Sequence, residues 1–371
     1  MKYYNIRRLL DDYPTAHYYL VIGERSNGKT YSALDYALER YFRTGEQFAY
    51  VRRWGEDIRR KNLSQLFAAH IENGQVLKYS NKQWQGITYT GNKFRLTKLS
   101  VNDKGKEQYE TSDEPIGYAF DLNSMEHYKS ISFPKITTVI FDEFISRNGY
   151  LPNEFILFTN TLSTIIRQRN NVKIMMLGNT VNKSCPYFSE MGLNHVKDQE
   201  QGSVDIYRYG GSNLQVVVEY AESTTKHGGK SSDVYFAFDN PELQMITQGS
   251  WEIAVYPHKP CPFAPKDIIF MFFIEFESEL VQAEVVEVPS GIFLFFHRKT
   301  GEIKYPDKDI VYTTRASEKW NYRMCLTKQT DKLSRKIMQL INENRAFYAD
   351  NEVGEIIRNY LMWSDSYNIR N

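Results

Sequence analysis

The sequence predicts an α/β protein with a mostly parallel sheet, followed by a smaller α+β domain. Up to about residue 195, short apolar runs of strand type alternate with segments of helical period, the pattern of parallel strands joined by helices. From about residue 248 several strands follow one another before a helical tail. The length of 371 residues is enough for two domains.

In the first domain, expected at residues 1–195, the elements are predicted from apolar periodicity. Tyr18 to Ile22 is a short β-branched and aromatic run that ends at Gly23, as a buried strand does. Apolar residues from Tyr31 to Leu38 then recur at helical spacing. Further strands are expected at "EQFAYVRRW", "ITTVIFDEF" and "VKIMMLGNT", with the helix "LPNEFILFTNTLSTIIRQR" between the last two.

A connector is expected at residues 196–247 and the second domain at 248–371. Polar, glycine-rich stretches such as "STTKHGGKSSD" surround one short strand, "LQVVVEYA", in the connector. Strands of the second domain are expected at "SWEIAVYPH", "DIIFMFFIEFE", "LVQAEVVEVP" and "GIFLFFHRKTGEIKY", before a helical tail from Lys328 to about Trp363.

The loop between the first strand and the first helix has the spacing of a phosphate-binding loop. Residues 23–30 read G-E-R-S-N-G-K-T, which fits G-x-x-x-x-G-K-[ST]. In such a loop, N–H groups point at a polyphosphate beside the positive end of a helix dipole. Lys29 would neutralise the β and γ phosphates, and Thr30 would offer its hydroxyl to Mg²⁺. A glycine turn and helix cap without a ligand is the alternative.

Two acids follow the apolar strand "ITTVIFDEF". A strand buried on both faces of a parallel sheet would present Asp142 and Glu143 at its carboxyl end, where open α/β sheets bind ligands. Asp142 would hold Mg²⁺ through water or Thr30, and Glu143 would orient and deprotonate the attacking water. The alternative is a strand that ends in solvated acids. The pair indicates ATP hydrolysis by a motor, since a kinase would need a separate acceptor site.

Three polar residues nearby are further candidates. Asn179 ends the strand after the acidic one, where an amide can sense the γ-phosphate, although a turn residue is an equal alternative. Arg167 and Arg169 fall at a helix end before that strand. They would cap carbonyl groups, the favoured interpretation, or reach a neighbouring subunit's nucleotide as an arginine finger.

Composition limits the other possibilities. With 46 basic and 45 acidic residues the net charge is +1, so any DNA contact must come from a local patch. Three widely spaced cysteines favour a reducing compartment without disulfides or a zinc cluster. The N-terminus has no apolar core of signal-peptide length, and "IIFMFFIEF" is too short to span a bilayer. We therefore expect a soluble, intracellular protein.

The chain resembles the phi-29-type DNA-packaging (encapsidation) ATPases of small tailed phages, relatives of terminase large subunits. The resemblance rests on "VIGERSNGKTY", "GEQFAYVRRW", "SFPKITTVIFDEF", "IIRQRNNVKIMMLGNTV" followed by "PYF", and a closing "YTT...LTK...KLSRKI". These run in order over nearly the whole chain. The resemblance implies an ASCE-type P-loop ATPase domain and a ring, usually of five subunits, that docks on the portal of a procapsid in the host cytoplasm and drives double-stranded DNA inward.

By position, the resemblance also implies roles for single residues. Arg167 resembles the finger given to the next subunit, and Lys129 in "EHYKSISFP" resembles a second basic residue that acts across the interface. Asp142 and Glu143 resemble the metal carboxylate and the catalytic base. The expected nucleotide contacts for ATP are Gly23, Arg25, Ser26, Asn27, Gly28, Lys29, Thr30 and Arg53.

In the second domain, terminase relatives carry an RNase H-like nuclease that binds two metals. Glu275, Glu277 and Glu279 are spaced by two on a predicted strand, so they would share one face and either bind metal or form its solvated side. No aspartate pair is evident nearby, and the resemblance implies a nuclease-like fold without activity. Arg298, Lys299 and Lys304, on a predicted hairpin, would contact phosphates or a packaging RNA, or simply be solvated.

Two other function classes stay open from the sequence. One is a P-loop translocase on single-stranded nucleic acid, such as a helicase, which would use aromatic stacking platforms. The other is a terminase in which the ATPase regulates an active nuclease. Dependence on double-stranded DNA separates the first from packaging, and plasmid cleavage in Mn²⁺ identifies the second.

Overall fold

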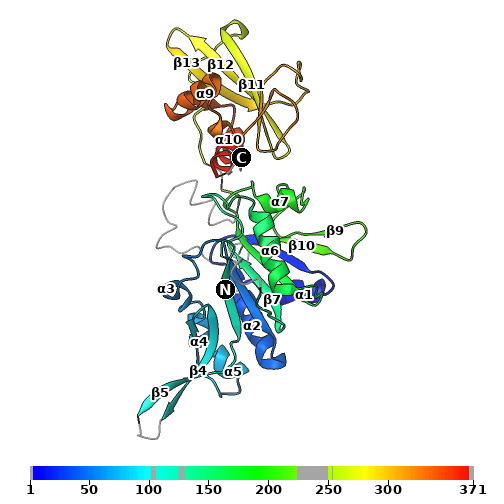
Figure 1. The fold of residues 1–371 in the computed structure, drawn as a ribbon, viewed down its shortest axis with the longest axis vertical. Coiled ribbons are helices and arrows are strands. Elements are labelled where there is room, and N and C mark those ends of the chain that lie inside the picture. Colours follow the sequence, from blue (N-terminus) through cyan, green and yellow to red (C-terminus); the bar gives the residue numbers. More distant parts are fainter. Residues whose placement is uncertain (1–2, 102–105, 125–129, 224–249, 253, 367–371) are drawn as a thin grey trace. The chain divides into compact units, whose positions relative to one another are not determined.

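The structure, a computed structural model, describes residues 3–101, 106–124, 130–223, 250–252 and 254–366. The chain divides into two compact units, drawn in Figure 1. The first comprises Met1–Ser146 and Asn153–Trp251, and the second Arg147–Pro152 and Glu252–Asn371. None of the described helices is long and apolar enough to cross a membrane. Cys185, Cys261 and Cys325 are free thiols.

The first unit is built on a sheet that has ten strands in the described residues, in the order β3-β4-β6-β2-β7-β8-β1-β10-β9, with β5 added beside β4. The path from β6 to β10 is parallel throughout. The mostly parallel sheet predicted from the alternating pattern is therefore confirmed. The strands are β1 (Tyr18–Gly23), β2 (Gln47–Arg52), β3 (Gly86–Thr90), β4 (Lys93–Val101), β5 (Glu107–Thr111), β6 (Gly117–Asp121), β7 (Ile136–Asp142), β8 (Lys173–Asn179), β9 (Val204–Arg208) and β10 (Gln215–Tyr220).

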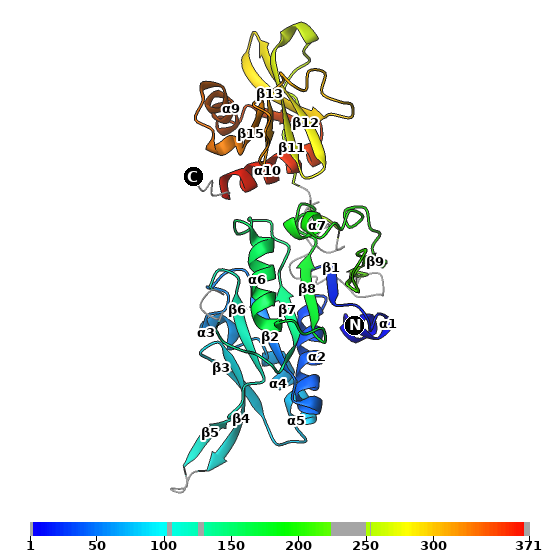
Figure 2. The ribbon, with the colours of Figure 1, turned by 45° about the vertical axis from the view of Figure 1, so that its right-hand side comes forward.

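Helices cover both faces of this sheet, because its central strands are apolar on both sides. Ile140 of β7 belongs to a buried cluster with Leu34 and Leu38 of α2, whereas the next residue, Phe141, stacks on Phe158 of α6 at 5.0 Å between ring centroids. Successive strand residues point to opposite faces, so α2 and α6 lie on opposite sides (Figure 2). The helices are α1 (Ile6–Asp12), α2 (Lys29–Thr44), α3 (Arg60–Leu63), α4 (Ala68–Glu72), α5 (Gln75–Tyr79), α6 (Glu154–Ile166) and α7 (Pro186–Glu190).

The predicted connector is wrong for its first half. Strand β10 lies beside β1 with Val216, Val217 and Val218 fully buried, and β9 pairs with β10. The β-branched run buries apolar surface by pairing at the edge of the sheet, whereas in a solvated linker that surface would stay in water. The first unit therefore runs past residue 195 to Trp251. Residues 224–249 of the predicted connector lie outside the described residues.

The second unit has a sheet of six described strands in the order β15-β14-β11-β12-β13-β16. Strands β11 to β13 form an antiparallel meander, β14 and β15 add in parallel beside β11, and β16 adds in parallel beside β13. Phe272, Ile274 and Leu294 pack in one core with Ile357 and Tyr360 of α10. The elements are η3 (Pro265–Asp267), β11 (Ile268–Phe276), β12 (Glu279–Val288), β13 (Gly291–Arg298), β14 (Val311–Thr313), β15 (Tyr322–Met324), η4 (Leu326–Lys328), α9 (Lys332–Asn342), β16 (Ala346–Tyr348) and α10 (Asn351–Ser366).

Two predicted elements of this unit are wrong. The described part of "SWEIAVYPH" forms no strand and contributes only an isolated bridge between His258 and Tyr348. The single helical tail is divided by β16, because α9 ends before Asn344, whose φ of 57° is left-handed, and the chain then returns to pair with β13. Helical periodicity alone does not reveal a three-residue strand of this kind.

Candidate functional site

The phosphate-binding loop has the strand, loop and helix that its sequence predicted. Strand β1 ends at Gly23 and helix α2 begins at Lys29. Gly28 is the N-cap with a φ of 93°, and a Cβ atom there would lie 3.2 Å from the Cβ of Tyr3. Glycine is therefore required at this position both by the left-handed backbone and by the close approach of Tyr3. The loop presents the N-terminus of a sixteen-residue helix to the cleft, where anions are stabilised.

The amino group of Lys29 is folded back into this loop. Its Nζ donates to the carbonyl oxygen of Glu24 at 2.6 Å, to Asn27 Oδ1 at 3.1 Å and to Asn179 Oδ1 at 3.2 Å. Burial lowers the pKa of Lys29 to about 8, although the Asp142 and Glu24 charges act in the opposite direction. A dehydrated ammonium group held by neutral oxygens gains strongly from a phosphate.

Asp142 closes the other side of the cleft. Its carboxylate accepts hydrogen bonds from the Thr30 hydroxyl, 3.1 Å from each oxygen, and from the Tyr50 hydroxyl at 2.8 Å. Burial raises the pKa of Asp142, while Arg52 and the Tyr50 hydrogen bond act to lower it. Thr30 and Asp142, predicted as the magnesium pair, are thus in direct contact before any metal binds, and their oxygen atoms are ligands that Mg²⁺ prefers.

Glu143 follows the last residue of β7 in a left-handed conformation, with a φ of 58°, which is unfavourable for a non-glycine residue. Its side chain is 57% exposed, and Arg52 Nη2 donates to Glu143 Oε2 at 2.7 Å. Arg52 also contacts Asp57 at 3.3 Å. The residue expected to activate water is therefore held by an arginine of the neighbouring strand.

Arg52 was missed as a site residue, and Arg53, expected to contact the nucleotide, is buried and bonded elsewhere in this structure. Arg53 is 5% exposed, and its guanidinium donates to Glu154 Oε2 and to the carbonyl oxygen of Phe144, both at 2.7 Å, and to that of Glu143 at 3.2 Å. Adjacent residues leave a strand on opposite faces, so only one of the two arginines can reach the acidic pair from the cleft side. Arg53 instead holds the backbone carbonyl groups that follow the acidic pair on the other side of the strand.

A cleft of about 410 Å³ gathers the predicted residues. Arg53 and Gly23 are the predicted contacts that do not line it, although Lys29 Nζ lies 3.3 Å from the carbonyl oxygen of Gly23. Within the described residues, the buried Asn27 Nδ2 has no acceptor, which fits the arrival of a phosphate oxygen. The lining residues are Arg25, Ser26, Asn27, Gly28, Lys29, Thr30, Tyr31, Asp142, Glu143, Leu177, Gly178 and Asn179.

The two candidate arginines at the end of α6 differ in role. Arg169 donates to the carbonyl oxygens of Ile165, Ile166 and Ile136, which is the predicted cap. Arg167 is exposed, and its guanidinium donates to the carbonyl oxygen of Ile131 at 3.0 Å. Lys129, predicted as a second trans-acting residue, lies outside the described residues.

Arg167 lies far from the cleft that contains the acidic pair. Arg169, two residues later, contacts Ile136 at the start of β7, whereas Asp142 ends that strand. A seven-residue strand spans roughly 20 Å. Arg167 is therefore at the opposite end of the sheet from the acidic pair, beyond the reach of an arginine side chain.

The predicted acidic stripe of the second unit is wrong. Glu275 lies on β11 and Glu279 starts β12, with Glu277 in the turn between them at a φ of 55°. The chain reverses there, so the three carboxylates do not share one strand face. Among the described residues, no group of three His, Cys, Asp or Glu side chains is placed to hold a metal.

The basic residues of the predicted hairpin are also placed differently. Strand β13 ends at Arg298, which forms ion pairs with Glu279 at 3.5 Å and Glu352 at 3.1 Å. Lys299 and Lys304 follow outside any strand, and Lys304 Nζ lies 5.1 Å from the ring centroid of Tyr305. These residues form a loop rather than a hairpin.

Known proteins match this chain at both sequence and fold level. The DNA packaging protein of Bacillus phage B103 is 32% identical over 176 residues, 47% of each chain, so the chain spans about half the length of this curated relative in the alignment. The solved structure of the Phi-28 gp11 DNA packaging motor covers 100% of this chain and 99% of its own at 18% identity and a TM-score of 0.54. The bacteriophage Phi-29 viral genome packaging motor assembly covers 96% of both at 21% identity and a TM-score of 0.53.

At these identities the two structures are evidence of a shared fold only. The family model described as podovirus DNA encapsidation protein (Gp16) matches residues 1–208, which include the phosphate-binding loop, the acidic pair and Asn179. With more than half of its length matched by that model, the chain belongs to the podovirus DNA encapsidation protein family.

Proposed function

We propose that this protein is an ATP-driven motor that translocates double-stranded viral DNA into a preformed procapsid through its portal. The observation that carries the proposal is the convergence of Lys29, the Thr30–Asp142 pair and Glu143 in one cleft. Family membership connects this hydrolytic site to DNA encapsidation.

The cleft supports ATP hydrolysis with Mg²⁺. Thr30 and Asp142 would hold the ion, which neutralises charge on the phosphates when bound. Lys29 would exchange carbonyl oxygens of its loop for phosphate oxygens, and Asn179 would move with it because the two are bonded. Glu143 would accept the proton of the attacking water on its carboxylate, whose Oε2 accepts a hydrogen bond from Arg52. The left-handed backbone at Glu143 keeps the side chain at the mouth of the cleft.

A ring of subunits, expected to be a pentamer, completes the site. The separation of Arg167 from its own cleft supports its action on a neighbour's nucleotide, where it would stabilise charge developing on the γ-phosphate. Lys129 is proposed to act in the same way. Head-to-tail contacts between identical subunits close into rings of this kind.

For the second unit we propose an RNase H-like fold without nuclease activity. The strand order β13-β12-β11-β14-β15, antiparallel on one side of β11 and parallel on the other, supports the fold. A two-metal nuclease site needs several carboxylates clustered together. Here the neighbour of Glu275 on the adjacent strand β14 is Thr313 and not a second acid, which supports the proposed loss of activity. The loop with Lys299 and Lys304 is proposed to contact DNA phosphates or a packaging RNA.

The proposed partners are double-stranded DNA and the portal of the procapsid, in the host cytoplasm and only during packaging. The test combines the full-length protein with portal-bearing procapsids, double-stranded DNA and ATP, and measures DNA that becomes protected from nuclease. Protection that is lost with Lys29→Ala supports the proposal. Hydrolysis stimulated only by single strands would favour a helicase, and plasmid cleavage in Mn²⁺ would favour an active nuclease.

A further inference from the structure

The chain leaves the first unit shortly after the acidic pair. Residues Arg147–Pro152, which we call the strap, belong to the second unit, whereas Ser146 and Asn153 on either side belong to the first. Only residues 144–146 separate Glu143 from the strap, and so short a connection spans at most about 14 Å when fully extended. The residue expected to activate water is therefore joined to the second unit by a short piece of chain.

The chain before the strap and the chain after it are both bonded to one buried side chain of the first unit, Arg53. Its guanidinium donates to the carbonyl oxygens of Glu143 at 3.2 Å and Phe144 at 2.7 Å, where the chain leaves the first unit. It also donates to Glu154 Oε2 at 2.7 Å, directly after the chain returns. Hydrogen bonds from a charged group are strong, so we expect both ends of the strap to move together with the Glu143 backbone.

Within the second unit, the strap is held by helix α10. Arg147 Nη2 forms an ion pair with Glu355 Oε1 at 3.1 Å, and Arg358 Nη2 donates to the carbonyl oxygen of Arg147 at 2.8 Å. The ring of Tyr150 meets that of Trp363 edge to face, with 6.3 Å between their centroids. Side-chain and main-chain contacts together therefore fix the strap on α10.

Glu355 is the centre of this contact. Its side chain is 12% exposed, and its Oε1 also accepts a hydrogen bond from the backbone N–H of Ala254 at 3.0 Å. Its Oε2 lies 3.9 Å from Arg358 Nη1 and has no hydrogen-bond donor among the described residues. A buried carboxylate depends on its cationic neighbours, and its hydrogen bonds weaken steeply when their geometry changes. A small displacement of the strap therefore changes its contact with α10.

We propose that the strap connects the nucleotide cleft to the second unit, and that Arg147 and Glu355 are the pair through which movement passes. When the backbone at Glu143 shifts during ATP hydrolysis, the ends of the strap shift with it, and α10 follows through Glu355. Energetic coupling between distant sites is carried by such chains of packed and hydrogen-bonded groups. The inference rests on the proposed ATPase function and deepens it, because it names the path from hydrolysis to the second unit.

The first test compares ATP hydrolysis with DNA packaging in the full-length protein. Arg147→Met and Glu355→Gln should keep ATP hydrolysis within about twofold of the natural rate, while the DNA protected per ATP hydrolysed falls about tenfold, a usual size for coupling between two sites. Arg147→Lys, which keeps the charge, should recover part of the loss. The matched control is Glu352→Gln on the same helix, because Glu352 pairs with Arg298 of β13, also at 3.1 Å, and not with the strap. It should keep both activities.

Two results of this test would overturn the proposal. One is normal packaging by both strap variants. The other is an equal loss of hydrolysis and packaging in correctly folded variants, because the strap would then be part of the hydrolytic site and not a connection from it.

The second test does not depend on packaging. Hydrogen exchange of the full-length protein, with and without an ATP analogue, reports the local stability of each region separately. The nucleotide should slow exchange in the loop at residues 23–30 and should also change it in the strap and in α10. In Arg147→Met and Glu355→Gln, the change at residues 23–30 should stay, whereas the change in α10 should be lost.

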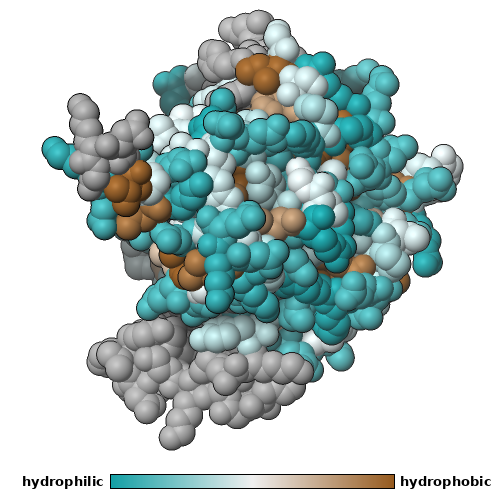
Figure 3. Space-filling model, turned by 90° about the horizontal axis from the view of Figure 1, so that it is seen from below, coloured by the Kyte–Doolittle hydropathy of each residue, from teal (hydrophilic) through white to brown (hydrophobic). Residues whose placement is uncertain are grey.

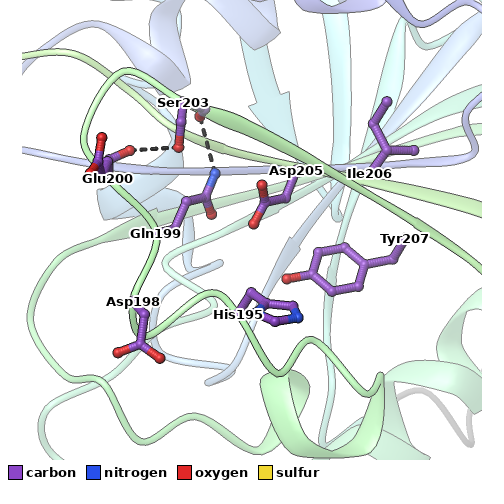
Figure 4. A pocket seen from close by; sticks show the side chains of 8 residues that line it. All are labelled: His195, Asp198, Gln199, Glu200, Ser203, Asp205, Ile206 and Tyr207. Carbon is purple, nitrogen blue, oxygen red and sulfur yellow. Dashed lines mark hydrogen bonds between the residues drawn. The ribbon is translucent and has the colours of Figure 1, made fainter.

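Two regions at the ends of the first sheet serve as references, because the strap follows β7 in its middle. One is the polar pocket at β9, where Figure 4 shows Asp198, Gln199 and Tyr207. The other is the ribbon of β4 and β5, which projects from the first unit (Figure 1). Figure 3 shows a hydrophobic patch on a part that projects at the left of an otherwise mostly hydrophilic view. Exchange in both regions should be the same with and without nucleotide.

The exchange pattern separates failure of the strap from failure of the proposed function. A nucleotide effect at residues 23–30 of the natural protein without any change in α10 would overturn the strap and leave the ATPase site intact. An equal change in α10 and in both references would also overturn the strap, because the nucleotide would then stabilise the whole protein. No effect at residues 23–30 would overturn both proposals.

Discussion

Arg53 provides the sharpest test of the site, because the structure gives it a role different from the expected one. Its guanidinium is 5% exposed and bonds Glu154, whose side chain is fully buried. Truncation in Arg53→Leu leaves that carboxylate without its cation. Breaking one side of a buried pair typically costs about 3–5 kcal/mol. For a unit of this size, such a loss lowers the melting temperature by roughly 6–20 °C.

The assay is thermal unfolding of the full-length protein, followed by nucleotide binding at a temperature where the variant is folded. Replacing both partners, as in Arg53→Leu with Glu154→Leu, should recover part of the loss, because no charge then stays buried. The ATP affinity of Arg53→Leu should change little, whereas that of Lys29→Ala should fall strongly. If Arg53→Lys melts normally but binds ATP much more weakly, the guanidinium reaches the nucleotide and the reasoning fails.

The remaining predictions concern the cleft and the subunit contact. Lys29→Ala and Glu143→Gln should both abolish ATP hydrolysis, but only the first should lose ATP affinity, and normal turnover by Glu143→Gln would show that another residue is the base. Burial lowers the pKa of Lys29 to about 8, so its amine loses the proton above that pH and ATP affinity should fall by up to about tenfold per pH unit. The ATP affinity of the Lys29→Ala variant should not change with pH in this range. An equally flat profile for the natural protein would contradict the assignment of Lys29. Mixing Arg167→Ala with Lys29→Ala subunits should restore some ATP hydrolysis that neither variant has alone, because each supplies the residue that the other lacks and arginine fingers contribute roughly 10³ to 10⁵ in rate. No rescue in mixed rings would mean that Arg167 does not act in trans. DNA binding should be independent of sequence and weaken by roughly 10³ between low and moderate salt if about six phosphates are contacted; a preferred duplex sequence would count against translocation.

Local chemistry was enough to predict that the phosphate-binding loop and the acidic pair lie together in one cleft. The loop from Gly23 to Thr30 needs only its own backbone and the helix it begins, and Asp142 and Glu143 need only a buried strand that ends beside it. These features depend on neighbours in the chain, so spacing and periodicity identify them. Their convergence with Asn179 also followed, because parallel strands bring their carboxyl ends to one edge.

Features that depend on long-range packing could not be predicted from the sequence. Whether Arg52 or Arg53 faces the cleft depends on which side of β2 meets α6. Strands β9 and β10 join the sheet because β1 offers an uncovered edge to Val216–Val218. Glu275 and Glu279 separate because the meander of the second unit turns between them. Strand periodicity is the same for either face and for either side of a hairpin, so only the partners across the sheet distinguish these outcomes.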